Sequence, residues 1–323
     1  MHRTLIVPLD GSELAERALP HAERLAQADH GRLVLQRVAI APLPPVIDNS
    51  DWEQLQFDAV TEAEQYLAEV AARLDGRVPV ETAVPYAYGR AARAILDGIA
   101  TFAADGVVMA THGRTGLPHL LHGSTAEAVL AESPVPVLLV HARPGEASGT
   151  PFDPVSARLM VPLDGSVFAE AALRPALDLL DSAGELVLVA VAEPPDRVLR
   201  DENGRVLAYL DQQEQARKLE TREYLMAVAT RLRQQDPGVR ISIDVRVGRP
   251  APSIVLAAVE RVVDVVVMAT HGRTGLGRAI LGSVAGEVLR TGSTPVLLVH
   301  PLTEGGRPTE PTRGARPTPW VVA

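Results

Sequence analysis

The sequence contains no cysteine in its 323 residues. Disulfide bonds, thiolate nucleophiles and cysteine-ligated zinc or iron–sulfur centres are therefore excluded. A chain without cysteine suits a reducing compartment, and the cytoplasm is the expected location.

Lysine is nearly missing as well, because Lys218 is the single lysine and lies in a polar stretch of helical character. This excludes a phosphate-loop lysine and disfavours Schiff-base chemistry. The formal net charge of −9 argues against broad binding to nucleic acid or to an anionic membrane surface. An acidic protein can still bind a single phosphate group locally.

Long apolar runs are missing too. No run approaches the roughly 18 apolar residues of a membrane span, and the apolar stretch near the N-terminus is too short for a signal peptide, so no membrane partner is expected. The sequence also has no Walker loop, Gly-x-Ser-x-Gly elbow, His-Glu-x-x-His motif or Gly-x-Gly-x-x-Gly fingerprint. The sequence therefore lacks the motifs that usually identify hydrolases and dehydrogenases.

The sequence does contain an internal repeat. LIVPLDGS at residues 5–12 returns as LMVPLDGS at 159–166, VVMATHGRTGL at 107–117 returns unchanged at 266–276, and PVLLVH occurs at 136–141 and 295–300. The repeat predicts two tandem domains, over residues 1–143 and 157–300. Residues 144–156, rich in Pro, Gly and Ser, are predicted to be a linker, and residues 301–323 a disordered tail.

Each copy alternates β-branched runs with stretches of helical period, which is typical of a parallel α/β sheet. The predicted fold class is α/β, with two tandem doubly wound domains that each contain a five-stranded parallel sheet. In the first copy, strands are predicted near Thr4–Asp10, Arg32–Val38, Val78–Val84, Gly106–Ala110 and Val135–Val140. In the second copy, they are predicted near Arg158–Asp164, Glu185–Val191, Arg240–Val247, Asp264–Ala269 and Pro295–Val299.

A helix predicted over about residues 51–74 carries apolar side chains at spacings of three and four. We interpret this stripe as core that packs on the sheet and not as a cofactor-binding element. The stripe consists of Trp52, Leu55, Ala59, Ala63, Tyr66, Leu67, Val70 and Leu74.

Ligands of open parallel sheets bind beyond the carboxyl ends of the strands. At this edge, the first strand of each copy ends in the sequence Pro-Leu-Asp-Gly-Ser. Asp10 and Asp164 therefore stand at this edge of the sheet. A purely structural interpretation makes each Asp-Gly-Ser a turn and helix N-cap, because both side chains accept bonds from free helix N–H groups.

The fourth strand of each copy leads into a glycine-containing loop and then into a helix. Nine residues separate Gly113 from Gly123-Ser124-Thr125, and the same spacing joins Gly272 to Gly282-Ser283-Val284. A glycine loop at a helix N-terminus presents unpaired N–H groups and a partial positive charge, which suit an anionic phosphate.

These residues resemble the universal stress protein family, through the pattern Gly-x2-Gly-x9-Gly-Ser/Thr after a strand together with VPLDGS and PVLLVH, over nearly all of residues 1–300. The resemblance implies an adenine-nucleotide alpha-hydrolase-like fold with strand order 3-2-1-4-5, and ATP, with magnesium, across the ends of the first and fourth strands. In the first copy, it implies nucleotide contacts from Pro8, Leu9, Asp10, Val38, Met109, Ala110, Gly113, Arg114, Gly123, Ser124 and Thr125. In the second copy, it implies contacts from Pro162, Leu163, Asp164, Val191, Met268, Ala269, Gly272, Arg273, Gly282, Ser283 and Val284.

The sequence departs from the family pattern at its first glycine, which is Ala110 in one copy and Ala269 in the other. A methyl group at a point of close backbone approach weakens contact with a nucleotide. The first copy also has Pro118, His119 and His122 in its loop, where the second has Gly277, Arg278 and Leu281. The second copy is therefore the better candidate site.

Other candidates carry weaker signals. His112, His119 and His122 are interpreted as loop residues and not as metal ligands, because only His112 has a counterpart in the second copy, and no metal site is predicted. Arg114 and Arg273 either touch a phosphate or are ordinary surface arginines. Ser124 begins a capping box that gives its hydroxyl a competing structural role.

The leading hypothesis is an ATP-binding stress-response module with at most slow ATP hydrolysis, because no carboxylate pair or base poised beside a nucleophile flanks the loop. The alternatives are a magnesium-dependent nucleotide hydrolase that uses Asp10 or Asp164, and a nucleotide-free interaction protein. The last strands, Pro136–Val140 and Pro295–Val299, are predicted to pair and form a pseudo-dimer within the chain. A homodimer of the whole chain is left open.

Overall fold

The chain divides into two compact units. The computed structural model describes residues 3–41, 49–88, 91–111, 124–141, 156–181, 183–195, 198–200, 206–270, 281–300, 303–304 and 307–308. The first unit comprises Met1–Pro154 with Pro295–Ala323, and the second comprises Val155–Thr294. The last strand of the second sequence copy is thus counted with the first unit.

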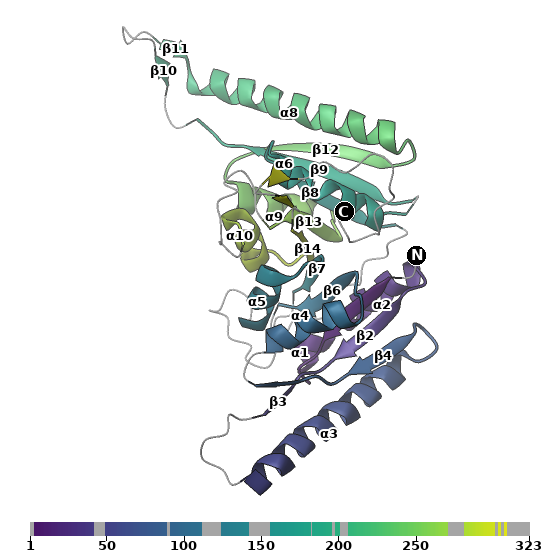
Figure 1. Ribbon diagram of the computed structural model, residues 1–323. Coiled ribbons are helices and arrows are strands. Elements are labelled where there is room, and N and C mark those ends of the chain that lie inside the picture. Colours follow the sequence, from purple (N-terminus) through teal and green to yellow (C-terminus); the bar gives the residue numbers. More distant parts are fainter. Residues whose placement is uncertain are drawn as a thin grey trace. The chain divides into compact units, whose positions relative to one another are not determined.

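The first unit alternates strands and helices along the chain (Figure 1). Its elements are β1 (Thr4–Pro8), α1 (Glu13–Glu16), α2 (Leu19–Ala28), β2 (Arg32–Gln36), β3 (Ala39–Ala41), α3 (Asn49–Leu74), β4 (Val80–Ala83), β5 (Tyr86–Tyr88), α4 (Ala91–Thr101), β6 (Gly106–Ala110), α5 (Ser124–Glu132) and β7 (Val137–Val140). The strands β4, β2, β1, β6 and β7 pair in this order and all in parallel. This is the predicted order 3-2-1-4-5.

The second unit repeats this plan. Its elements are β8 (Arg158–Pro162), α6 (Val167–Glu170), α7 (Leu173–Leu179), β9 (Glu185–Ala192), β10 (Leu199–Arg200), β11 (Val206–Ala208), α8 (Leu210–Gln235), β12 (Arg240–Val247), α9 (Pro250–Glu260), β13 (Val265–Ala269) and α10 (Ser283–Thr291). The parallel order β12, β9, β8, β13 matches strands 3-2-1-4. The doubly wound α/β prediction is therefore confirmed.

The fifth strand of the second copy, β14 (Val296–Val299), lies in the first unit and pairs antiparallel with β7. Leu297 is the partner of Leu138 in this ladder. The two strands named in the sequence-based prediction thus pair, whereas the pseudo-dimer that they were expected to form remains a prediction.

Two-residue strands also occur in the predicted tail, where β15 (Thr303–Glu304) pairs antiparallel with β16 (Arg307–Pro308). The remainder of the tail and residues 144–155 of the predicted linker lie outside the described residues. Short additional sheets join β3 with β5 in parallel, and β10 with β11 in antiparallel fashion.

The first helix of each copy is split into two pieces at a proline. In α2, Pro20 stands in the first turn, and α1 ends at Glu16, four residues earlier. Pro175 stands in the same way in α7, after α6 has ended at Glu170. Proline clashes with the carbonyl four residues before it and kinks or breaks a helix, which accounts for the interruption before both prolines.

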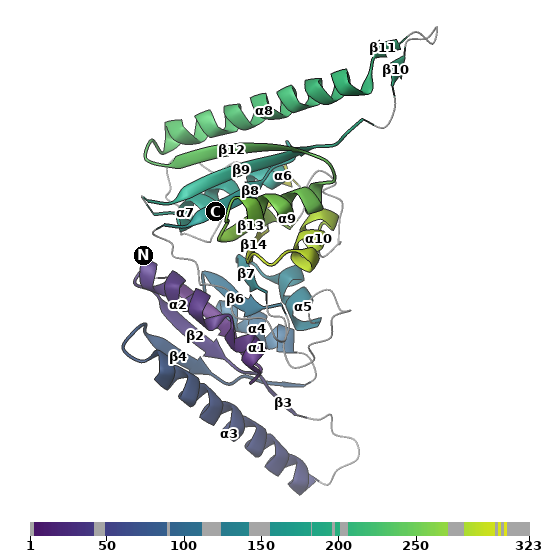
Figure 2. The ribbon, with the colours of Figure 1, turned by 180° about the vertical axis from the view of Figure 1, so that it is seen from behind.

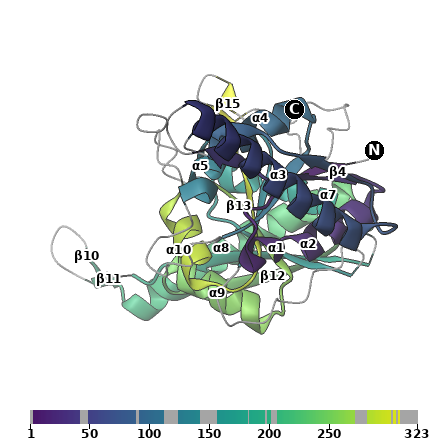
Figure 3. The same ribbon diagram turned by 90° about the horizontal axis from the view of Figure 1, so that it is seen from below.

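The two long helices pack on their sheets through only part of their length. In α3, Ala63, Leu67, Val70 and Leu74 are buried, but Leu55 is 43% exposed. The prediction that the whole apolar stripe is core is wrong at Leu55, because helical periodicity does not show where the sheet under a helix ends. Figure 3 shows α3 beside β4, which it contacts, and Figure 1 shows α8 alongside β12.

The core of each unit surrounds its first strand. Leu5, Ile6 and Val7 of β1 are completely buried, as are Leu159 and Val161 of β8. Continuous apolar strands are required here because helices cover both faces of a parallel sheet. In the second unit, α9 lies against β9 and α10 (Figure 2). No helix in the described part of the chain is long and apolar enough to cross a membrane.

Matched glycines in the two copies predict a measurable difference in stability. A Cβ atom on Gly31 would lie 2.2 Å from the backbone oxygen of Arg3, whereas one on Gly184 would lie 3.1 Å from the backbone oxygen of Ala157 and 2.5 Å from a rotatable methyl group of Leu180. We expect Gly31→Ala to lower the free energy of unfolding by about 2 kcal/mol, and Gly184→Ala by less than about 1 kcal/mol. Urea unfolding followed by circular dichroism measures both values. Equal losses would contradict the packing described for these turns.

Candidate functional site

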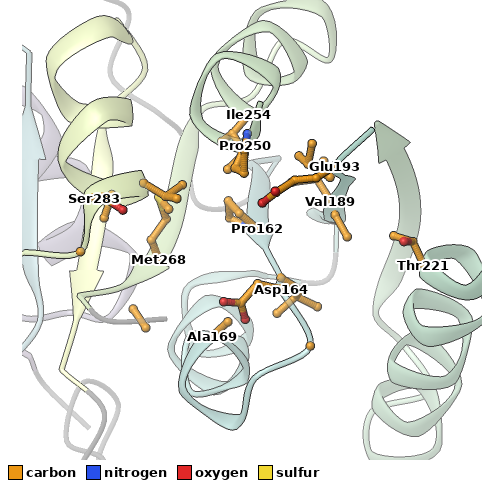
Figure 4. A pocket seen from close by; sticks show the side chains of 18 of the residues that line it. Pro162, Asp164, Ala169, Val189, Glu193, Thr221, Pro250, Ile254, Met268 and Ser283 are labelled. Atoms are coloured by element: carbon orange, nitrogen blue, oxygen red, sulfur yellow. The ribbon is translucent and has the colours of Figure 1, made fainter. Parts of the chain in front are cut away.

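The second unit contains a cavity of about 550 Å³ at the carboxyl ends of its strands (Figure 4). Residues from the ends of β8, β9 and β13, from α8 and α9, and from the start of α10 form its walls. They are Pro162, Leu163, Asp164, Gly165, Ala169, Val189, Ala190, Val191, Glu193, Glu220, Thr221, Tyr224, Pro250, Ile254, Met268, Ala269, Thr270, Gly282, Ser283, Val284 and Ala285. This volume lies within the range of small-molecule sites.

The Asp-Gly-Ser turn forms the floor of the cavity. Oδ1 of Asp164 accepts hydrogen bonds from the backbone N–H of Ser166 at 2.9 Å and from its hydroxyl at 2.6 Å. The Ser166 hydroxyl oxygen accepts a bond from the N–H of Ala169 and so caps α6. Gly165 has a φ of 82°, which favours glycine. The turn and N-cap interpretation is thus confirmed, and Asp164 also lines the cavity.

The same turn occurs in the first unit. Oδ1 of Asp10 accepts bonds from the N–H and hydroxyl of Ser12 at 3.0 and 2.6 Å, and Ser12 caps α1. Gly11 has a φ of 85°. The backbone geometry at the end of the first strand is therefore shared by both copies.

The N-terminus of α10 faces the cavity through Gly282, Ser283, Val284 and Ala285. The N–H of Gly282 donates to the carbonyl of Thr270 at 2.7 Å, and the helix ladder begins when Gly286 donates to Gly282. The N–H groups of the three residues between them belong to the first turn, which has no intrahelical acceptors. Together with the helix dipole, they provide a place for an anionic group.

The rest of the cavity lining includes apolar and acidic side chains. Val189, Ile254 and Met268 supply apolar surface, and Asp164, Glu193 and Glu220 supply carboxylates. Figure 4 shows the Asp164 and Ser283 side chains on separate elements around the same space, with Glu193 near Pro250. No lysine or arginine occurs among the lining residues that the structure describes.

Tyr224 fixes the position of α8 at the cavity wall. Its hydroxyl donates to Glu170 of α6 at 3.0 Å, and Arg231 pairs with the same carboxylate. Burial raises the pKa of the Tyr224 phenol above its usual value near 10, and the carboxylates of Glu170 and Asp164 raise it further. The phenol is therefore neutral at physiological pH and serves as a hydrogen-bond donor.

The first unit has an equivalent arrangement, in which the Tyr66 hydroxyl donates to Glu16 at 2.9 Å and Arg73 pairs with Glu16 at 2.7 Å. Burial, followed by the Glu16 hydrogen bond, raises the pKa of Tyr66 as well. Each copy thus ties its first short helix to its long helix by the same three residue types.

The structure brings together all the predicted second-copy residues that it describes, because each of them lines the cavity. Gly272 and Arg273 lie outside the described residues. In the first unit, Pro8 ends β1, Leu9 and Asp10 follow it, and Val38 follows β2. Met109 and Ala110 end β6, and Ser124 and Thr125 begin α5. Gly113, Arg114, Gly123 and the three loop histidines of the first copy lie outside the described residues.

Sequence reasoning missed the wall formed by α8 and α9. Glu193 follows the carboxyl end of β9 directly, so its position was a signal that could have been used. Glu220, Thr221 and Tyr224 come from the middle of α8, and no pattern in the sequence indicates which part of this helix reaches the strand ends.

Comparison with known proteins gives consistent results. The model of the Universal stress protein family matches residues 1–141 and 156–300. A universal stress protein in the QAH/OAS sulfhydrylase 3'region of Thermus aquaticus is 39% identical over 140 residues, 43% of this chain and 99% of that protein. One from Mycolicibacterium smegmatis is 27% identical over 310 residues, 92% of this chain and 97% of the other.

A solved structure supports the fold in the same way. The crystal structure of a universal stress protein from Archaeoglobus fulgidus DSM 4304 has a TM-score of 0.63 to this chain at 21% identity. The match covers 92% of this chain and 96% of the other.

The two half-buried tyrosines predict how stability depends on alkaline pH. The tyrosine pKa is higher in the folded chain than its unfolded value near 10, so the unfolded chain loses the proton at lower pH. The contribution of each tyrosine to the free energy of unfolding is therefore fully present below about pH 10 and is lost as the pH rises above it. We expect a slope well under the limit of about 1.4 kcal/mol per pH unit for each tyrosine, because both are half-exposed. Urea unfolding between about pH 9 and 11 should show a shallower fall in the Tyr66→Phe/Tyr224→Phe variant. With a single lysine in the chain, few other groups titrate there, and identical slopes would contradict the account.

Proposed function

The chain belongs to the universal stress protein family, and from this premise we propose that its second unit binds ATP in the cavity at the ends of β8, β9 and β13. The observation that carries the proposal is the convergence of three features on one space. Apolar side chains, the Asp164 carboxylate and the open N-terminus of α10 all line the same cavity. A nucleotide needs each of these, for its base, its ribose and its phosphates.

The distribution of charge orients the bound nucleotide. Carboxylates on the β8, β9 and α8 side repel a triphosphate, but they accept hydrogen bonds from ribose hydroxyls and from an amino group. The α10 N-terminus attracts the phosphates, as does any magnesium ion that arrives with them. The base and ribose therefore lie towards Asp164 and Glu193, and the phosphates lie towards Ser283.

The proposed activity is nucleotide binding and not rapid turnover, in keeping with a module that responds to adenine nucleotides during stress. At the floor of the cavity, Oδ1 of the Asp164 carboxylate accepts two hydrogen bonds from Ser166 and so holds the turn. This arrangement gives no support to a dedicated hydrolytic base. Phosphate release well above background, lost in Asp164→Ala, would instead favour the hydrolase alternative.

Titration calorimetry of the full chain with magnesium and ATP tests the proposal. We expect binding by the wild type and at least a tenfold loss of affinity in Ser283→Glu, because a carboxylate at the start of α10 repels phosphates. The same substitution suits the helix itself, since an acidic side chain in the first turn stabilises it.

Two controls make the result specific. Ser283→Ala removes the hydroxyl without adding charge and should reduce ATP affinity by only a few-fold. Adenosine, which has no phosphates, should bind wild type and Ser283→Glu equally. No ATP binding by the wild type would support the nucleotide-free alternative, and an equal loss of adenosine binding would contradict the proposed orientation.

A further inference from the structure

The two copies can be aligned residue by residue from their hydrogen bonds. Gln36 of β2 is the register partner of Pro8, as Val189 of β9 is of Pro162, so the next residues, Arg37 and Ala190, correspond. The paired tyrosine triads make Tyr66 the counterpart of Tyr224. Four residues earlier on each helix, Glu62 corresponds to Glu220.

In the second unit, Ala190, Glu220 and Tyr224 all line the cavity and form its wall on the α8 side. The small Ala190 side chain leaves the space between the strand end and the helix open.

In the first unit, the same three positions are joined by one side chain. Arg37 is only 9% exposed, its guanidinium lies 4.8 Å from the centre of the Tyr66 ring, and Nη2 donates to Oε1 of Glu62 at 2.6 Å. The arginine therefore occupies the side of the first unit that corresponds to the cavity wall. The Tyr66 ring face and the Glu62 carboxylate both stabilise the guanidinium cation. A ligand that displaced this side chain would separate a buried charge from both partners, which costs free energy.

We propose that Arg37 closes the α3 side of the nucleotide site in the first unit, so that the chain binds one nucleotide, in the second unit. This inference rests on the proposed function. It assigns the difference between the copies to a single side chain that fills the space beside the α3 wall, in addition to any difference in the loops. The hydrogen bonds of the turns at Asp10 and Asp164 are the same, so this part of the site is built on one plan in both units.

The stoichiometry of ATP binding by the full chain, measured by titration calorimetry with magnesium, tests the proposal. We expect about one ATP per wild-type chain and about two per Arg37→Ala chain, with urea unfolding used to show that the variant is folded. Two ATP per wild-type chain, or one per folded Arg37→Ala chain, would overturn the proposal and leave the proposed function intact.

The reciprocal variant Ala190→Arg gives an independent test, because Glu220 and Tyr224 are present to hold the introduced guanidinium. We expect it to abolish binding by the chain, and undiminished affinity would overturn the proposal even if Arg37→Ala does not fold. No binding by wild type and by both variants would instead show failure of the proposed function itself.

Discussion

Parallel pairing of the first strand with two neighbours is the constraint on which the rest of each unit depends. Because β1 and β8 are buried in the middle of their sheets, their side chains must be apolar, and polar chemistry is displaced to the residues that follow them. Asp164 is the first polar side chain beyond β8, and the Gly165 turn brings it back under the cavity. The start of α10 reaches the same edge because β13 runs parallel beside β8.

The two copies keep this backbone plan and differ in the side chains that stand on it. Both retain the Asp-Gly-Ser turn and the tyrosine that, through a hydrogen bond to an ion-paired glutamate, ties the short first helix to the long helix. These interactions hold the frame of the site, so their preservation is a structural requirement in either copy. Arg37, which directly follows β2, and its counterpart Ala190 in β9 have no such structural role, and they differ without disturbing the frame.

The sequence was informative wherever a local rule applies. The parallel α/β class, the capped turns at Ser12 and Ser166 and the cluster of residues at the strand ends follow from periodicity, capping chemistry and parallel topology. The strand order came from the family resemblance. The contribution of α8 to the cavity could not be foreseen in this way, because the point at which a long helix passes the sheet edge depends on tertiary packing. For the same reason, Leu55 is exposed although it belongs to the apolar stripe of α3. Nothing in the sequence indicates that the Arg37 guanidinium lies over the Tyr66 ring.

Photolabelling with 8-azido-ATP, followed by peptide mapping of the full chain, tests most directly whether the cavity of the second unit is the nucleotide site. The account predicts label on peptides from residues 185–195 or 206–235, and its removal by excess ATP. Label confined to the first copy, or label that ATP does not displace, would contradict it.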